Sequence, residues 1–137
     1  SAAGALSGMT GVTGKAEIVR AALDCIAYQI TDLVLAMEQD TGIPMRELRV
    51  DGGPARNRYL MQFQSDISGK TLKIPQAEEL SGIGAAYMAG ISAGLYSEEE
   101  LFSGWEGSIF TPSMDVNVRR EKLNGWKKAV AGVLDHT

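Results

Sequence analysis

The first regular pattern of apolar and polar positions runs from residue 15 to residue 40. Apolar side chains recur there at alternating spacings of four and three residues, which is typical of one apolar stripe along a helix. Glu17 in the first turn suits the positive end of a helix dipole, and Gly42 supplies a C-terminal stop. We expect a long helix whose stripe packs into the core. The stripe consists of Val19, Leu23, Ile26, Ile30, Leu33 and Met37, and it is widened by Ala22, Ala27 and Val34.

A strand-and-helix unit follows this long helix. Residues 48–51 predict a short strand that ends at Gly52 and Gly53, and Pro54 then stands at a favourable first-turn position for a helix. That second helix runs to about residue 67 and stops at Gly69. Its inward-facing side chains are expected to be Leu60, Met61, Phe63, Gln64 and Ile67.

The remaining pattern predicts one more strand and several helices. Residues 71–74 predict a strand, and residues 78–94 predict a helix that is unusually rich in glycine and alanine. A capping box opens a short helix over 97–102, and residues 104–112 are interpreted as a loop. The last helix covers 117–134. Its inward positions are expected to be Val118, Leu123, Trp126, Val130 and either Val133 or Leu134.

Strands that alternate with helices predict an α/β protein with a parallel sheet and helical crossovers. Two strands are too few to cover the apolar faces of so many helices, so we expect sheet partners from missing sequence or from another chain. Residues Ser1–Gly14 are rich in small residues and follow no strand or helix of their own. We interpret them as a chain that enters in mid-fold, which makes the 137 residues a domain truncated at its N-terminal side.

Composition narrows the class of protein only a little. The chain is 45% hydrophobic and 22% charged, which is ordinary for a globular protein. Its net charge of −4 argues against a nucleic acid or an anionic membrane as the main partner, but a small anion remains compatible. The single cysteine, Cys25, fits a reducing compartment, and no apolar run approaches the ~20 residues of a membrane span. We therefore expect a cytoplasmic protein.

The candidate for chemistry is the turn from Gly52 to Asn57. In α/β sheets, ligands bind at the carboxyl ends of strands, beside the N-termini of the next helices. Gly52 and Gly53 remove both Cβ atoms, so a flat base or a phosphate could lie against the backbone, while Arg56 and Asn57 would offer hydrogen bonds from the first turn of the helix. The same spacing is equally compatible with a tight strand-to-helix turn that binds nothing, and it matches neither the dinucleotide fingerprint nor the P-loop.

Other reactive residues carry weaker hypotheses. His136 lies in the tail, and Cys25 on the long helix has no histidine near it in sequence, so an inert, partly buried thiol is the preferred interpretation. Glu78 and Glu79 suit a helix start better than a metal, and Asp51 suits a turn. The sequence shows no nucleophile–base pair, no metal cluster and no general base. The basic face of the last helix is interpreted as solvated, with a docking surface as the alternative.

Residues 48–67 resemble the signature segment in the C-terminal domain of FGGY-family carbohydrate kinases, above all the branch that acts on glycerol. The similarity is concentrated in the runs Arg49–Gly53 and Leu60–Ile67 and extends in order over nearly the whole chain. Further runs that are similar to the family are Ile26–Asp32, Ala36–Ile43, Gly84–Gly90 and Gly125–Val130.

The resemblance implies part of an actin-like, ribonuclease H-like ATPase fold with two domains and a cleft between them. ATP would lie on the C-terminal domain, represented by residues 1–137, and the polyol or sugar mainly on the N-terminal one. The family's catalytic aspartate lies upstream of residue 1, and Mg²⁺ would be held mostly by parts outside this chain. Nucleotide contacts carried over from the family fall on Gly53 and Asn57, and we add Gly52 and Arg56 by proximity.

The implied function is ATP-dependent phosphorylation of a polyol or sugar hydroxyl, with this chain supplying the nucleotide-binding part. Residues 54–56 and 81–83 depart from the glycerol-specific pattern, which leaves a pentulose kinase such as xylulokinase open. A non-catalytic interaction module and an actin-like nucleotide sensor are the alternatives from other classes. The expected partners are ATP, a small polyol or sugar, the protein's own N-terminal domain and further copies of itself.

Overall fold

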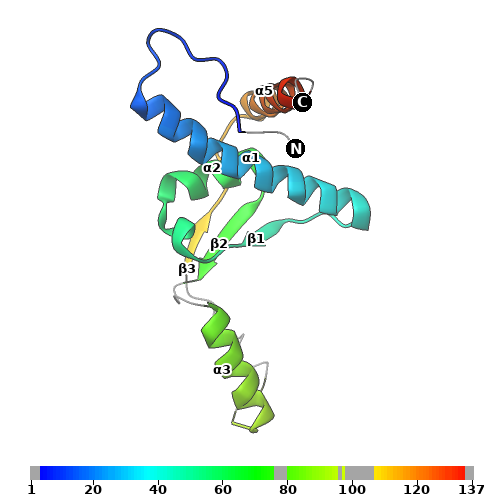
Figure 1. Ribbon diagram of the computed structural model, residues 1–137. Helices are drawn as coiled ribbons and strands as arrows, with labels where there is room; N and C mark the ends of the chain where they lie inside the picture. Colours follow the sequence, from blue (N-terminus) through cyan, green and yellow to red (C-terminus); the bar gives the residue numbers. More distant parts are fainter. Residues whose placement is uncertain (1–3, 76–79, 96, 98–106, 135–137) are drawn as a thin grey trace.

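The computed structural model describes residues 4–75, 80–95, 97 and 107–134. Helices and strands alternate along the chain, and Figure 1 shows α1 and α2 layered over a small sheet while α3 stands apart from that body. The elements in order are α1 (Lys15–Thr41), β1 (Glu47–Arg49), the 3₁₀ helix η1 (Gly53–Arg56), α2 (Arg58–Ser68), β2 (Thr71–Pro75), α3 (Leu80–Ser92), β3 (Gly107–Phe110) and α5 (Val116–Leu134).

The sheet confirms the α/β class and corrects its topology. The strand order is β1-β2-β3, with β1 parallel to β2 and β3 antiparallel to β2. Leu48, Leu72 and Phe110 stand opposite one another across the three strands. The prediction of a loop over 104–112 was therefore wrong for residues 107–110. The sheet is mixed rather than purely parallel.

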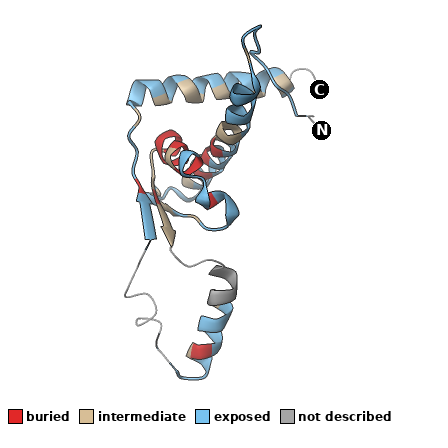
Figure 2. Ribbon diagram, turned by 90° about the vertical axis from the view of Figure 1, so that its left-hand side faces the viewer, coloured by how far each residue is buried: buried red, intermediate tan, exposed pale blue. Residues whose placement is uncertain are grey.

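The core lies on one face of this sheet. α2 provides half of its central cluster, and Figure 2 shows buried residues concentrated in this helix. The central cluster consists of Ala27, Ala55, Leu60, Met61, Phe63, Ile67, Leu72 and Phe110. Every side chain of α2 predicted to face inward is buried, because a short helix pressed between a sheet and a second helix has little outer surface.

α1 has the predicted length but presents a different face to the core. Its buried residues are Ala27, Thr31 and Val34, which contact α2 and the sheet side of the molecule. The Thr31 hydroxyl donates to the Ala27 carbonyl at 2.8 Å and accepts from the Gln64 amide at 3.2 Å. Ala27 and Val34, which were expected only to widen the stripe, are the apolar residues of α1 that are buried, whereas most of its large apolar residues were wrongly placed in the core. Of that stripe, Val19, Ile26, Ile30, Leu33 and Met37 expose between 42% and 62% of their surface, and only Leu23 packs against the core.

Both ends of α1 are capped as the sequence predicts. The backbone N–H of Gly14 donates to the Glu17 carboxylate at 2.9 Å, and hydrogen bonds from the backbone N–H groups of Glu17 and Gly14 lower the pKa of Glu17. At the other end, Gly42 adopts φ 67° and its N–H donates to the Glu38 carbonyl at 2.9 Å. Only glycine takes this left-handed conformation without strain.

α5 is held to the body by aromatic and polar contacts. The Trp126 ring stacks on Tyr28 of α1 at 5.2 Å, and its indole N–H donates to Asp32 at 2.6 Å. The Asp66 carboxylate, on α2, accepts hydrogen bonds from two residues just before α5. The donors are the backbone N–H groups of Ser113 and Met114, at 2.6 and 3.1 Å. Leu123, Trp126 and Val130 are half-buried as expected, whereas Val118 is 42% exposed and was wrongly placed inward.

The remaining predictions fall partly beyond what the structure describes. α3 begins at Leu80 and ends at Ser92, within the expected span of 78–94. The short helix predicted over 97–102 lies, apart from Ser97, outside the described residues. Glu78, Glu79 and His136 also lie outside them.

Candidate functional site

The candidate site begins where the chain leaves the sheet. The N–H of Val50 donates to the Lys73 carbonyl at 3.0 Å, so the pairing of β1 with β2 continues one residue past the strand. Gly52 then adopts φ 89°, and its carbonyl accepts from the N–H of Ala55 at 3.0 Å. The turn therefore requires glycine at position 52 for conformational reasons alone.

Gly53 differs from Gly52 in this respect. Its φ lies outside the left-handed region, and a Cβ built on it would meet nothing within 4 Å. The described part of the fold thus gives no reason for glycine here, because another residue would fit without strain. A glycine in open space at the carboxyl edge of a parallel strand pair is the arrangement expected where an external group lies against the backbone.

Asn57 closes the turn and opens α2. It is the N-cap residue, and its Oδ1 accepts from the N–H of Leu60 at 3.1 Å. Arg56 lies in η1 and Asn57 is the cap, so the prediction that both occupy the first turn of the helix was wrong by two residues and one residue, respectively. The cap leaves the exposed amide nitrogen of Asn57, which contacts no acceptor among the described residues, available to a ligand.

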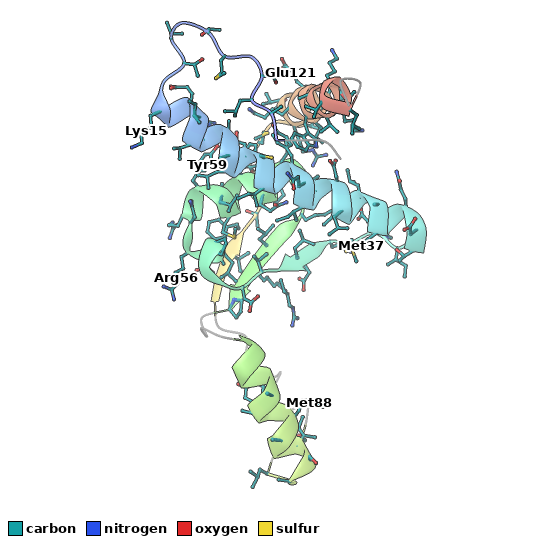
Figure 3. All side chains as sticks on the ribbon, in the orientation of Figure 1. Lys15, Met37, Arg56, Tyr59, Met88 and Glu121 are labelled. Carbon is teal, nitrogen blue, oxygen red and sulfur yellow. The ribbon has the colours of Figure 1, made fainter. Side chains whose placement is uncertain are left out.

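Two apolar anchors fix this turn to the core. Ala55 is 9% exposed and Leu60 only 2%. Arg56, between Ala55 and Asn57, is exposed, and Figure 3 shows it projecting away from the body of the molecule. The four predicted site residues therefore lie together on one anchored turn.

The first turn of α2 is also tied to α1 by a polar network that the sequence did not predict. The Tyr59 hydroxyl donates to Asp24 at 2.5 Å and accepts from the Arg20 guanidinium at 2.9 Å. Burial, followed by the hydrogen bond to Asp24, raises the pKa of Tyr59 above its usual value. Burial likewise raises the pKa of the neighbouring Tyr28 to about 12. Both phenols are thus neutral near pH 7, and they position the helix without supplying charge.

Arg58 is a second residue near the turn that the sequence pattern did not indicate. It is the first residue of α2, and its guanidinium lies 5.9 Å from the centre of the Phe110 ring. With Arg56 it brings positive charge to the start of α2, where the helix dipole adds to the attraction for an anion. In the sequence, only the positions of Arg56 and Arg58 on either side of Asn57 indicated this role.

The other candidates do not assemble into a site. The described residues contain no group of three or more histidine, cysteine or acidic side chains that could hold a metal ion. Cys25 is half-buried and its sulfur accepts from the Gln29 amide at 3.1 Å. No helix in the described ranges is both long and apolar enough to cross a bilayer.

The chain belongs to the FGGY family of carbohydrate kinases. Its residues 1–93 match the model of this family's C-terminal domain. The small mixed sheet with its helices agrees with that assignment, since the related kinases have the actin-like ATPase fold.

Proteins similar in sequence to this chain include glycerol kinases of several bacteria. The chain is 47% identical over 131 residues to the glycerol kinase of Petrotoga mobilis and 42% identical over 136 residues to that of Clostridium botulinum. These matches cover 94% and 98% of the chain but only 26% and 27% of the relatives. The chain therefore spans about a quarter of the length of the glycerol kinases it matches.

Solved structures that superpose on this chain are also kinases. The Plasmodium falciparum glycerol kinase, solved with ADP, superposes with a TM-score of 0.87 at 34% identity over 97% of this chain and 27% of its own. The xylulose kinase of Rhodospirillum rubrum superposes with a TM-score of 0.77 at 21% identity over 95% of this chain and 27% of its own. The second likeness, at that identity, concerns the fold alone.

Proposed function

We propose that this chain is the nucleotide-binding C-terminal part of an ATP-dependent kinase that phosphorylates glycerol or a related polyol. The observation that carries the proposal is Gly53, an exposed glycine that the described fold does not require, on the turn between β1 and α2. The relatives support the substrate class, because those at 42–47% identity are glycerol kinases.

In this proposal the turn holds the nucleotide by shape and by hydrogen bonds. The missing Cβ atoms of Gly52 and Gly53 let the nucleotide lie against the backbone, and the Asn57 amide donates to it. Arg56 and Arg58, together with the start of α2, favour its negative charge. The buried side chains of Ala55 and Leu60 hold the turn in place, so nucleotide binding needs to order few additional residues.

The described residues supply no general base, and they do not fit Mg²⁺ as a resident ion. They contain no cluster of acidic or histidine side chains that could coordinate it. In phosphoryl transfer the metal bridges phosphate oxygens, and a separate residue takes the proton from the attacking hydroxyl. We therefore assign to this chain the positioning of the nucleotide and leave the proton transfer to the rest of the full-length protein.

The test is the substitution Gly53→Val in the full-length protein. A branched side chain would fill the space beside the backbone, so we expect the Kd for ADP to rise at least about tenfold, equivalent to about 1.4 kcal/mol, with an unchanged melting temperature. Titration calorimetry with ADP and a thermal melt measure the two quantities, and a coupled assay with glycerol reports turnover.

The matched control is Gly132→Val. Gly132 lies on α5, far along the chain from the turn, and a Cβ built there also meets nothing within 4 Å. This variant should bind ADP like the parent protein. Equal ADP affinity in the Gly53 variant, the control and the parent would refute the site.

A further inference from the structure

The first turn of α2 is held on two sides by different kinds of contact. On its inner side Leu60 is buried in the core, while Arg58 and Tyr59 lie on its exposed side. The first N–H groups of a helix have no partner within the helix, so its first turn is held less firmly than the turns that follow. The position of this turn therefore depends on what its exposed side contacts.

Tyr59 supplies that contact through its hydroxyl group. The hydroxyl lies between two residues of α1, since it donates to the Asp24 carboxylate and accepts from the Nε–H of Arg20. Arg20 and Asp24 also form an ion pair at 3.9 Å, so the charges within the network offset each other. Burial, followed by the hydrogen bond to Asp24, raises the pKa of Tyr59, and the hydroxyl keeps the proton that it donates.

Both partners of this contact are themselves well supported. On α1, Leu23 packs against the core just before Asp24, and Ala27 is completely buried. On α2, the Tyr59 ring stacks on Phe63 at 6.0 Å with 6° between the ring planes. Figure 3 shows Tyr59 where the start of α2 meets α1. The ring thus directs the hydroxyl at a fixed part of α1.

The same short stretch of chain carries the cap of α2. The Oδ1 atom of Asn57 accepts from the N–H of Leu60, so residues 57–60 form one hydrogen-bonded turn that includes Tyr59. A movement of Tyr59 along α1 would move the Asn57 amide as well, because only Arg58 separates the two residues.

We propose, on the basis of the function proposed above, that Tyr59 is a positioning residue for the nucleotide. Its hydroxyl, bound between Asp24 and Arg20, holds the Asn57 amide nitrogen in the place from which it donates to the nucleotide. Tyr59 acts through Asn57 and adds no charge to the site.

The first test is Tyr59→Phe in the full-length protein, titrated with ADP. This substitution removes the hydroxyl and keeps the ring that stacks on Phe63. We expect the Kd for ADP to rise about threefold to tenfold, the range for a weakened hydrogen bond. The matched control is Tyr28→Phe, because the Tyr28 hydroxyl has no hydrogen bond among the residues that the structure describes. The control should bind ADP like the parent protein, and an unchanged Kd in Tyr59→Phe would overturn the proposal.

A double-mutant cycle with Asn57→Ser separates positioning from a general loss of stability. Serine keeps the cap of α2 but has no amide to position. In the Asn57→Ser protein, Tyr59→Phe should therefore raise the Kd for ADP by less than about twofold. All titrations are made well below the melting temperatures of the four proteins. An equal loss of affinity in both backgrounds would show that the hydroxyl does not act through Asn57 and would refute the proposal.

Variants of Asp24 distinguish an effect of geometry from an effect of charge. Loss of a carboxylate would tighten the binding of an anionic nucleotide if charge alone acted. The positioning role predicts the opposite sign, so Asp24→Ala should weaken ADP binding about as much as Tyr59→Phe does. Asp24→Asn keeps an acceptor oxygen for the Tyr59 hydroxyl and should restore the parent affinity to within about twofold. Tighter binding of ADP by Asp24→Ala would contradict the proposal.

Gly53→Val, measured in parallel, distinguishes the positioning role from the nucleotide site itself. Weaker ADP binding in Gly53→Val, together with an unchanged Kd in Tyr59→Phe, would leave the nucleotide turn in place and refute the role of Tyr59 alone. If neither variant changes the Kd for ADP, the nucleotide site is wrong and the positioning role is refuted with it.

Discussion

Asn57 combines a structural role with the proposed binding role in one side chain. Its oxygen is committed to α2 through the bond from the Leu60 N–H, while its nitrogen is left for a ligand. A residue of this kind is difficult to interpret by simple deletion, since alanine removes both functions at once. Separating them requires a substitution that keeps the cap.

Asn57→Ser is such a substitution, because serine caps helices about as well as asparagine but has no amide. In the full-length protein we expect it to keep the melting temperature and to weaken ADP binding by a factor of about 3 to 10, as one hydrogen bond is worth roughly 1 kcal/mol. Asn57→Ala should weaken ADP binding similarly and also destabilise the protein by about 1 kcal/mol. Thermal melts and ADP titrations compare the pair. A serine variant that binds ADP like the parent protein would leave Asn57 as a cap only.

At this scale the sequence was a good guide, because glycine and asparagine act through local backbone geometry. Gly42 and Gly69 end their helices with φ 67° and 69°, as their positions predicted. Gly52 and Asn57 likewise act locally in the turn before α2, Gly52 through its φ of 89° and Asn57 through its cap. The tie from Tyr59 to Asp24 could not be predicted, because it joins residues 35 positions apart through a packing of α1 on α2 that no local pattern encodes.

Among the elements, α1 is fastened at its C-terminal end by a charged clamp. The Glu38 carboxylate accepts from the Lys70 ammonium, which belongs to the connection between α2 and β2, and from the backbone N–H of Met45 at 2.6 Å. The hydrogen bond from Lys70, followed by that from Met45, lowers the pKa of Glu38 below its usual value. Both side chains of the ion pair are largely shielded from solvent, with 15% and 17% of their surface exposed.

This clamp predicts a specific dependence of stability on pH. A carboxyl group with a lower pKa in the folded state stabilises the fold above its unfolded pKa, near 4.5, and loses that contribution as the pH falls through the lower folded pKa. We expect Glu38→Gln to be less stable than the parent chain at pH 7 and the difference to shrink between about pH 5 and pH 3. Urea midpoints across that range measure it, with Glu121→Gln, an exposed glutamate of α5, as the control. A difference that stays constant with pH would show that the clamp contributes no charge-dependent stability.

Helices with a long, regular apolar pattern were predicted well, whereas a strand that is defined by pairing with its neighbour was not. The 27 residues of α1 and the 11 of α2 were found from periodicity. β3 was missed, since its four residues carry one buried side chain, Phe110, and become a strand only by pairing with β2. The centre of the buried face of α1 was misjudged, because α2 packs against Ala27 and Val34 at the margin of the predicted stripe and not against its large apolar residues.

Considered as a whole molecule, the chain carries the proposed nucleotide turn and, among its described residues, no group of side chains that could hold a metal ion. We therefore expect the isolated 137-residue chain to transfer no phosphate from ATP to glycerol. A coupled assay measures this, with the full-length protein as the positive control. The isolated chain could instead show turnover that scales with its concentration and is lost in the Gly53→Val chain. That result would contradict the proposal that this chain only positions the nucleotide.

The antiparallel contact between β2 and β3 has a consequence for how the chain tolerates change. Pro75 stands opposite Gly107 on the neighbouring antiparallel strand, so residues 76–106 connect two positions that lie side by side in the sheet. Asp66 then fastens the returning chain at Ser113. Because Pro75 and Gly107 already pair, replacing 76–106 by a tight turn would lower the entropy cost of closure by about 2 kcal/mol. We expect the three-stranded sheet, α2 and the turn at Gly53 to keep their arrangement in such a shortened chain.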